Sequence, residues 1–186
     1  MISLSGNEVT KEMLKVFSKY QDANDALIHK WTELIFLSPR WWIGVTLAIV
    51  PWFIWWKLHN KNFKGDLLRA GFFMAIICTI LDGVGVQLGL WFYPYDTFPF
   101  IPGYFPWDLT LFPITMMTMI EIKPKCNPFY KSLLIALFYS ICEPLADLTK
   151  IYEPIIWKFY YSFPIYILLF LICNAVAKGK IFNSRF

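Results

Sequence analysis

Three acidic residues stand in stretches of the sequence that are otherwise apolar, and their side chains could transfer protons. Asp82 lies in "LDGVGVQLGLWFYP" (81–94), Asp108 lies in "PWDLTLFPITMM" (106–117), and Glu143 follows "LLIALFYSIC" (133–142). A carboxyl group in a water-poor environment tends to stay protonated, and it can then act as a general acid. We therefore predict that Asp82, Asp108 and Glu143 are catalytic residues.

The composition indicates what kind of elements must position these acids. The 186 residues are 58% hydrophobic, 20% aromatic and only 16% charged. A soluble domain of this length needs more polar surface, and several apolar runs approach the roughly 20 residues that cross a bilayer as a helix. We predict an all-α fold, a polytopic membrane helical bundle with about five transmembrane helices. The net charge of +4 gives no reason to expect nucleic-acid binding, because the basic residues flank apolar segments.

The pattern divides the chain into two parts. Residues 1–38 are predicted to form an N-terminal segment with an amphipathic helix over 8–37, and residues 39–180 are predicted to form the bundle. The predicted spans are about 41–58, 68–93, 107–122, 129–148 and 154–177. Pro113, Pro144 and Pro164 fall inside three of them, where each should kink the helix or free a carbonyl. The four cysteines lack C-x-x-C spacing, so we expect no metal site, and nothing indicates a cofactor.

The acids are predicted to meet near one side of the membrane. The second and fourth spans run in the same direction, with Asp82 near the middle of one and with Glu143 and Asp147 towards the far end of the other. The third span begins at that side with Asp108, and Thr115 lies two turns below on the same face. Because charge at membrane depth is costly, by roughly 3 kcal/mol per residue, such acids are paired, protonated or functional.

Small and aromatic residues surround these positions. Gly85 and Gly89 share the helical face of Asp82 and form a G-x-x-x-G pair, which lets another helix approach closely and turns Asp82 into the bundle. The predicted pocket is completed by Trp91, Tyr93, Trp107, Phe112, Thr115, Tyr139 and Asp147. Aromatic residues at this depth also form the interfacial belt of many membrane proteins, so a belt is the alternative interpretation.

Each acid outside the second span also has a structural interpretation. Asp108 could stabilise the N-terminus of its helix, Asp147 could pair with Lys150, and Glu143 could hydrogen-bond a neighbouring carbonyl. The candidate cationic partners near this boundary are Arg40, Lys150 and Lys158.

The loop charges indicate the orientation. Basic residues gather in the first connection (57–69), in the third (123–131) and in the tail, which holds Lys178, Lys180 and Arg185, whereas the second connection, "PYDTFPFIPGYFP", has none. By the positive-inside rule we predict a multi-pass protein of the cell membrane with a cytoplasmic C-terminus. An odd number of spans then places the N-terminal helix outside.

The N-terminal helix has an apolar stripe at helical spacing. The stripe comprises Met13, Phe17, Tyr20, Asn24, Leu27, Trp31 and Leu34. It could face the membrane surface, a second copy or another protein partner, or the protein's own bundle, and of these we favour the bundle.

The stretches "WWIGVTLAIVPWFIWW", "LDGVGVQLGLWFYP", "PWDLTLFPITMM" and "EPLADLTKIYEPIIWKFYYSFPIYI" follow one another over most of residues 41–170. In these stretches the chain resembles a family of small, uncharacterised multi-span membrane proteins of spore-forming Gram-positive bacteria. The resemblance implies a membrane location in such bacteria and no established activity.

A shorter pattern, over about 30 residues, consists of Asp82, then Gly89, Trp91 and Tyr93, then Pro106, Asp108 and Phe112. It is similar to the lycopene cyclase domain of bacterial carotenoid synthesis, which has an aspartate, a G-x-W-x-aromatic motif and a P-x-E-E-x-x-F motif at comparable spacing. Asp108 stands at the first glutamate position and Leu109 at the second. The resemblance implies isoprenoid cyclisation, in which a buried acid protonates an alkene, aromatic faces stabilise a carbocation, and water is excluded.

Three functions are compatible with the sequence. The first is a membrane-embedded enzyme that binds a lipid or isoprenoid and starts its cyclisation or hydration by protonation. The second is a small carrier that uses the carboxyls for protons or cations. The third is a non-catalytic accessory protein that docks a partner or a second copy through the N-terminal helix. The acidic cluster favours the first as the specific hypothesis.

Overall fold

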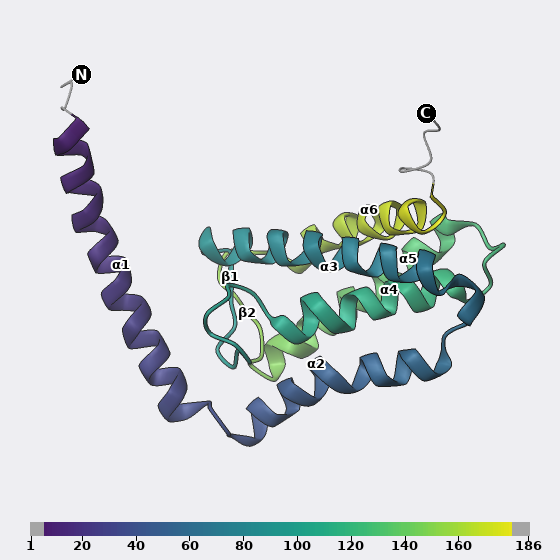
Figure 1. The fold of residues 1–186 in the computed structure, drawn as a ribbon, viewed down its shortest axis with the longest axis horizontal. Coiled ribbons are helices and arrows are strands. Elements are labelled where there is room, and N and C mark those ends of the chain that lie inside the picture. Colours follow the sequence, from purple (N-terminus) through teal and green to yellow (C-terminus); the bar gives the residue numbers. More distant parts are fainter. Residues whose placement is uncertain (1–5, 180–186) are drawn as a thin grey trace.

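The computed structural model of the chain describes residues 6–179 and consists of helices joined by short connections (Figure 1). The helices are α1 (Gly6–Leu34), α2 (Pro39–Leu58), α3 (Lys64–Gln87), α4 (Phe112–Glu121), α5 (Pro128–Leu148) and α6 (Phe159–Ala177). A 3₁₀ turn (Lys61–Phe63) precedes α3, and a π-helical turn (Trp107–Leu111) precedes α4. This confirms the predicted all-α class. Residues 1–5 of the predicted N-terminal segment, residue 180 of the predicted bundle, and Lys180 and Arg185 of the tail lie outside the described residues.

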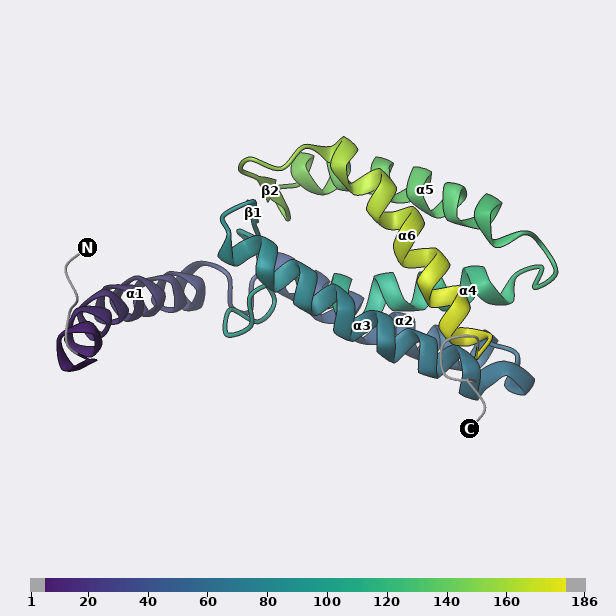
Figure 2. The same cartoon turned by 90° about the horizontal axis from the view of Figure 1, so that it is seen from above.

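Helices α2, α3, α4 and α5 run back and forth in roughly one direction, which is horizontal in Figure 1, and α6 crosses α3 obliquely, as Figure 2 shows. Helices α2, α3, α5 and α6 are each long and apolar enough to cross a membrane. The remaining element is the π-helical turn with α4; helix continues without a break over residues 105–121, a length of about 25 Å at 1.5 Å per residue. The described chain is therefore a membrane helical bundle.

Two helix boundaries at the bundle end that carries β1 differ from the prediction, and both differences shape that end. The second span ends at Gln87 instead of 93, because Gly89 adopts a left-handed φ of 67° and the Leu90 N–H bonds back to the Gly85 carbonyl at 2.9 Å. The fifth span begins at Phe159 instead of 154, because Glu153–Pro154 forms strand β2. This strand pairs antiparallel with β1 (Trp91–Phe92).

The end of the bundle opposite to β1 is packed with apolar side chains. Ala70, Met74, Met116 and Phe170 are fully buried and join α3, α4 and α6 in one core. Gly71 lets α4 approach, since a Cβ atom there would lie 3.2 Å from Cγ of Met117. This half of the bundle is a close-packed interior, whereas the acids lie in the other half.

Helix α1 does not pack along the bundle, so the interpretation that we favoured for its stripe is wrong. In Figure 1 the helix leaves the bundle and runs crosswise to the spans, and in Figure 2 it lies beyond the end of the bundle. None of its described residues is buried. It ends at Leu34, three residues before the predicted end, and Leu37 then takes a left-handed φ of 60° where the chain turns into α2.

Candidate active site

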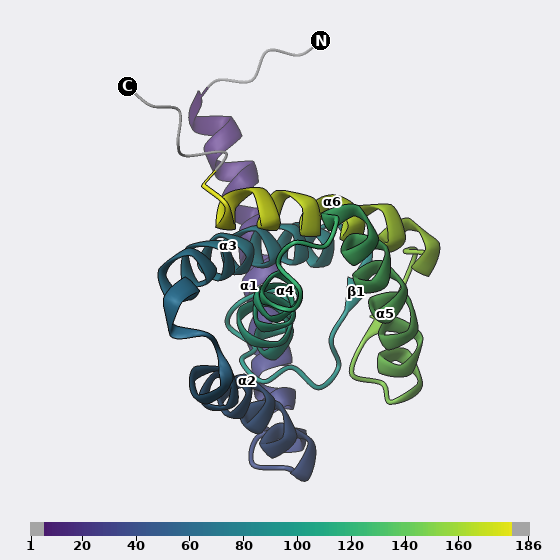
Figure 3. The same ribbon diagram turned by 90° about the vertical axis from the view of Figure 1, so that its right-hand side faces the viewer.

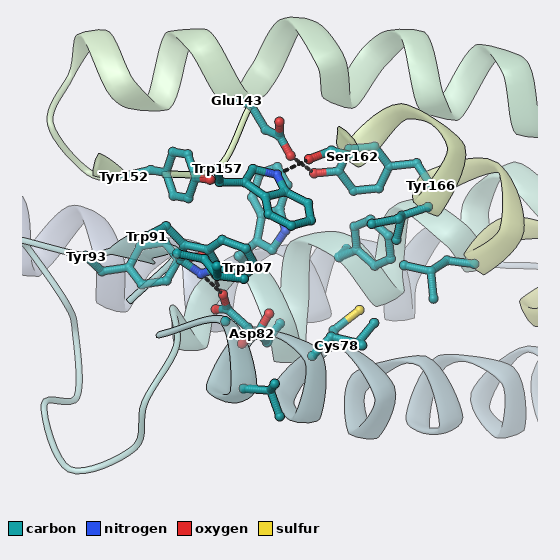
Figure 4. Close-up of a pocket in the computed structure, with 18 residues that line it drawn as sticks. Cys78, Asp82, Trp91, Tyr93, Trp107, Glu143, Tyr152, Trp157, Ser162 and Tyr166 are labelled. Carbon is teal, nitrogen blue, oxygen red and sulfur yellow. Dashed lines mark hydrogen bonds between the residues drawn. The ribbon is translucent and has the colours of Figure 1, made fainter. Parts of the chain in front are cut away.

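A cavity of about 270 Å³ lies at the bundle end that carries β1 and β2 (Figure 4). Asp82 from α3, Asp108 from the π-helical turn and Glu143 from α5 all line it. These three acids are buried, with 3–9% of their surface exposed. The three carboxyls that we predicted to be catalytic, which come from three separate helices, thus meet in one place.

Asp82 is held by three donors. Its Oδ1 atom accepts from Trp91 Nε1 at 2.6 Å and from the Tyr93 hydroxyl at 2.8 Å, and its Oδ2 atom accepts from the backbone N–H of Tyr104 at 2.9 Å. An ionised carboxylate can only accept hydrogen bonds, and three short hydrogen bonds of this kind stabilise its negative charge. Asp82 is therefore built to carry negative charge at membrane depth.

The turn after α3 brings these donors back to Asp82. Gly89 ends the helix, and the Leu90 carbonyl then accepts from the N–H groups of Ile155, Ile156 and Trp157 at 3.0–3.2 Å. Together with the pairing of β1 and β2, these bonds fix the residue 88–93 turn against the connection between α5 and α6. The rings of Trp91 and Trp157 meet edge to face, 5.0 Å between centroids.

Gly85 provides the space for the Trp91 ring. A Cβ atom on Gly85 would overlap that ring and lie only 2.6 Å from its Cε2 atom. Gly89 lies past the helix end, and no described residue comes within 4 Å of the position that its Cβ would take. The prediction that a second helix packs on the Gly85–Gly89 pair is therefore wrong. The Trp91 indole packs on Gly85 instead, and Gly89 ends the helix.

Asp108 owes its position to the π-helical turn. Pro113 has no N–H, so the Leu109 carbonyl lacks its α-helical partner, and it accepts instead from Trp52 Nε1 at 3.2 Å. Thr110 fastens the same turn to α2 by donating to the Ala48 carbonyl at 2.8 Å. A π-helical turn widens the helix and frequently marks a functional site; here it directs Trp107 and Asp108 into the cavity.

Asp82 and Asp108 form a carboxyl pair. The two carboxyl groups lie side by side, and like charges so close together repel each other when both are ionised, so the pair favours a proton on one of them. Gly103, at a left-handed φ of 125°, covers the pair: its Cβ would lie 2.9 Å from an Oδ2 atom of each. Because Asp82 accepts three hydrogen bonds that stabilise its ionised form, Asp108 is the member better placed to hold a proton.

Glu143 lies across the cavity from Asp82 (Figure 4). Its Oε1 atom accepts from the Tyr166 hydroxyl, and its buried Oε2 atom has no hydrogen-bond partner among residues 6–179. Ser162, one turn before Tyr166 on α6, accepts from Trp157 Nε1 at 2.9 Å. Glu143 therefore presents a free acceptor to the cavity.

The charge of the acids is not compensated by a cation. In the described part of the chain, Lys150 pairs with Asp147 at 3.2 Å and with Glu153 at 3.0 Å, and none of the ion pairs includes Asp82 or Asp108. Arg40 stacks on the Tyr95 ring at 4.0 Å instead. Glu143 and Lys158 are likewise absent from those ion pairs.

Burial keeps the phenols at the cavity rim protonated. It raises the pKa of Tyr93 well above its ordinary value, and the negative charge of Asp82 adds to the effect. Burial also raises the pKa of Tyr152, with Glu143 as the second cause. Both phenols therefore remain hydrogen-bond donors at any physiological pH.

The predicted pocket is only partly the observed one. Trp91, Tyr93, Trp107 and Phe112 line the cavity with the three acids. Three other predicted members do not line it. The Thr115 hydroxyl bonds to its own helix at Leu111, Tyr139 packs behind the wall with its ring 4.9 Å from that of Trp107, and Asp147 is the partner of Lys150.

Sequence reasoning missed the contribution of α6 and of the connection before it. Tyr152, Trp157, Ser162 and Tyr166 all line the cavity. The signal for two of them was present, because Ser162 and Tyr166 are polar residues one helical turn apart in an apolar span. Nothing local indicated Trp157, which reaches the cavity through the backbone bonds to Leu90.

The mouth of the cavity faces the lipid side of the bundle. Its lining includes Leu81 and Val84, whose side chains on α3 are 46% and 51% exposed. Residues of α6, Ile165 and Leu169, line the same region.

Among the residues that the structure describes, no group of three or more His, Cys, Asp or Glu side chains is placed to hold a metal ion. Comparison of the chain with protein-family models, with curated proteins and with solved structures gave no match. The site is therefore interpreted from its own geometry: two adjacent buried carboxyls, a third carboxyl with an unpartnered oxygen, and an aromatic wall between them.

Proposed function

We propose that the protein is a membrane enzyme that binds one end of an isoprenoid or similar unsaturated lipid and starts its cyclisation or hydration by protonation. One observation carries the proposal: Asp82, Asp108 and Glu143 converge, without a cation, on one aromatic cavity. A cluster of intramembrane acids is a functional site by default. In addition, the residues Asp82, Trp91, Tyr93, Asp108 and Phe112, which carry the resemblance to the lycopene cyclase domain, all line this cavity.

The reaction needs no oxidant and no cofactor. The Asp108 O–H gives its proton to one alkene carbon, and the carboxylate that remains lies beside the positive charge that this transfer creates on the substrate. The new C–H bond leaves a carbocation, which a second double bond of the substrate attacks to close a ring. A carboxylate such as Glu143, whose Oε2 atom is free, then removes a proton from the neighbouring carbon and restores an alkene. The proton then returns from Glu143 to Asp108, which restores the enzyme, and the net change is an isomerisation of the substrate.

The shape of the cavity supports a long apolar substrate of which only one end is inside. A volume of about 270 Å³ is near the lower limit of small-molecule pockets. The rings of Trp91, Trp107 and Phe112 would face a carbocation there, an arrangement that favours positive charge. The rest of the substrate would remain between lipid chains outside the mouth.

The orientation is part of the proposal. The connection after α2, the connection after α4 and the C-terminal end of α6 lie at the same end of the bundle (Figure 1). These segments hold most of the basic residues, so we assign this end to the cytoplasm. The protein would then be a multi-pass protein of the cell membrane, with the cavity in the outer half and α1 on the outer side.

The carrier function has less support. A carrier needs polar groups along the whole path, but the core that follows the cavity towards the other end consists of Met74, Met116, Met117 and Phe170. The cavity therefore continues into close-packed apolar side chains.

The proposal is tested by expressing the protein in a bacterial host that accumulates acyclic isoprenoids and by comparing lipid extracts by chromatography and mass spectrometry. A cyclised product keeps the substrate's mass and elutes differently, whereas a hydrated product gains the mass of one water. Loss of a general acid costs roughly 10²–10⁴-fold, so Asp108→Asn should abolish the new compound. Asp147→Asn is the matched control, because Asp147 does not line the cavity. Identical extracts from the wild type and Asp108→Asn would overturn the proposal.

A further inference from the structure

The apolar stripe of α1 is uncovered, and its orientation relative to the bundle is fixed. Met13, Phe17 and Tyr20 are 52–61% exposed. Only Asn24, Ile28 and Trp31, which lie nearest the bundle, are partly covered. The stripe therefore begins against the protein and continues beyond it.

The corner between α1 and α2 is held by aromatic rings and by two hydrogen bonds. The Phe36 ring lies between those of Trp31 and Trp41, at centroid distances of 5.5 and 5.2 Å. Trp31 Nε1 donates to the Asp96 carbonyl at 2.8 Å, and Trp41 Nε1 donates to the Thr97 carbonyl at 3.1 Å. Two indoles from the two helices thus hold adjacent carbonyls of one loop, which fixes both the direction of α1 and its rotation about its own axis.

These constraints turn the stripe towards the membrane. Helix α1 runs crosswise to the spans at one end of the bundle (Figures 1 and 3), which is the direction of the membrane plane. Trp31 belongs to the stripe and faces the loop of the bundle, so the whole stripe faces the side on which the bundle, and hence the bilayer, lies. The charged and polar face opposite carries Lys11, Lys15, Ser18, Asp22, His29 and Glu33.

The loop beside α1 extends the same apolar surface. A groove of about 590 Å³ separates Tyr20, Leu27 and Trp31 from the loop. On the loop side, Phe100 and Ile101 are 69% and 49% exposed. A lipid layer at this level would contact both walls of the groove at once.

We infer that α1 is an interfacial helix whose stripe inserts into the surface of the bilayer that the bundle crosses. The charges of α1 nearly balance, with Lys11, Lys15, Lys19 and Lys30 against Glu8, Glu12, Asp22, Asp25 and Glu33. Burial of apolar area, and not attraction to anionic lipid, therefore drives the insertion. A helix of this type lies with its apolar face about 5–10 Å below the headgroup boundary.

The experiment compares two spin labels on the full chain in vesicles of zwitterionic phosphatidylcholine. The labels are attached at Met13→Cys and Lys15→Cys, each in a Cys126→Ser background that removes the exposed native thiol. Both positions are exposed, so neither label disturbs packing. The two positions lie on opposite faces of α1 at nearly the same distance along the helix. Met13 precedes Tyr20, the first α1 residue that lines the groove beside the loop, so its label reports contact with lipid and not with the loop.

The measurement is the collision rate of each label with apolar oxygen and with a water-soluble nickel chelate. We expect the Met13 label to meet oxygen preferentially, at a depth of about 5–10 Å, and the Lys15 label to meet the nickel chelate. Equal access of nickel to both labels would overturn the inference. Protection of the Met13 label from both reagents, with dipolar coupling between labels, would also overturn it and would assign the stripe to a second copy.

Discussion

Gly85→Ala should disturb the candidate site more than any other single methyl group added to α3. The new Cβ would lie 2.6 Å from Cε2 of Trp91 and overlap the neighbouring ring atoms, so the indole must move. Moving it breaks the 2.6 Å hydrogen bond from Trp91 Nε1 to Asp82. Gly83→Ala is the matched control, since its Cβ would be 3.5 Å from the nearest atom, the Pro102 carbonyl oxygen, which is an ordinary contact.

The size of the effect follows from two contributions. Overpacking of a close-packed site costs roughly 1–3 kcal/mol, and a hydrogen bond to a charged group is worth roughly 1.5–3 kcal/mol. The gain in helix propensity from Gly to Ala, roughly 0.5–1 kcal/mol, is similar for both variants and largely cancels in the comparison. We therefore expect Gly85→Ala to be less stable than Gly83→Ala by about 2.5–6 kcal/mol.

The assay is equilibrium unfolding in mixed detergent micelles, titrated with a denaturing detergent and followed by tryptophan fluorescence. Gly83→Ala should unfold at or slightly above the wild-type midpoint, and Gly85→Ala well below it. If the two variants unfold together, the Trp91 ring does not occupy the space above Gly85, and the geometry that we describe for Asp82 is wrong.

Two further predictions concern the loop and the opposite end of the bundle. Burial raises the pKa of Asp96 from 3.8 to about 7, although the Phe98 N–H partly offsets it; the folded protein therefore binds this proton more tightly than the unfolded chain. The contribution of Asp96 to stability is complete below about pH 4 and is lost as the pH rises to about 7. Asp96→Asn should remove this part of the pH dependence of the unfolding midpoint, and an unchanged dependence would exclude Asp96 as its source. Lys131 is 5% exposed and donates to the carbonyls of Met119 and Ile120 at the end of α4, so Lys131→Met should lower the free energy of unfolding by about 1–3 kcal/mol. Lys125→Met, at an exposed position, is the control; equal stability of the two variants would contradict the capping role.

The carboxyl cluster could be predicted because its signals are local. An acid within an apolar run must avoid lipid, and the alternation of spans decides which acids lie at the same depth. That reasoning placed Asp82, Asp108 and Glu143 in one half of the membrane, and all three line one cavity. It failed for Asp147, because a single turn of helix separates a cavity position from one that pairs with Lys150 at the surface.

The role of the glycines could not be predicted from spacing. A G-x-x-x-G pair predicts a helix contact only if both glycines are helical, and Gly89 is not. Whether residues 88–93 continue α3 or fold back depends on partners more than sixty residues away, such as the N–H groups of Ile155 and Trp157 that bond to Leu90. Hydropathy does not distinguish a continued helix from a turn that folds back, because Trp91 and Phe92 would be placed among apolar groups in both cases.

The sequence by itself determined that this chain crosses a membrane as helices and that its few intramembrane acids share one level, because hydropathy and charge act on each segment independently. Only the tertiary structure decided which aromatic side chains surround the acids, that Asp82 and Asp108 lie side by side, and that α1 leaves the bundle with most of its stripe uncovered. Those outcomes depend on hydrogen bonds between distant segments, as at Leu90 and Asp96, and no local pattern contains the partners of a distant bond.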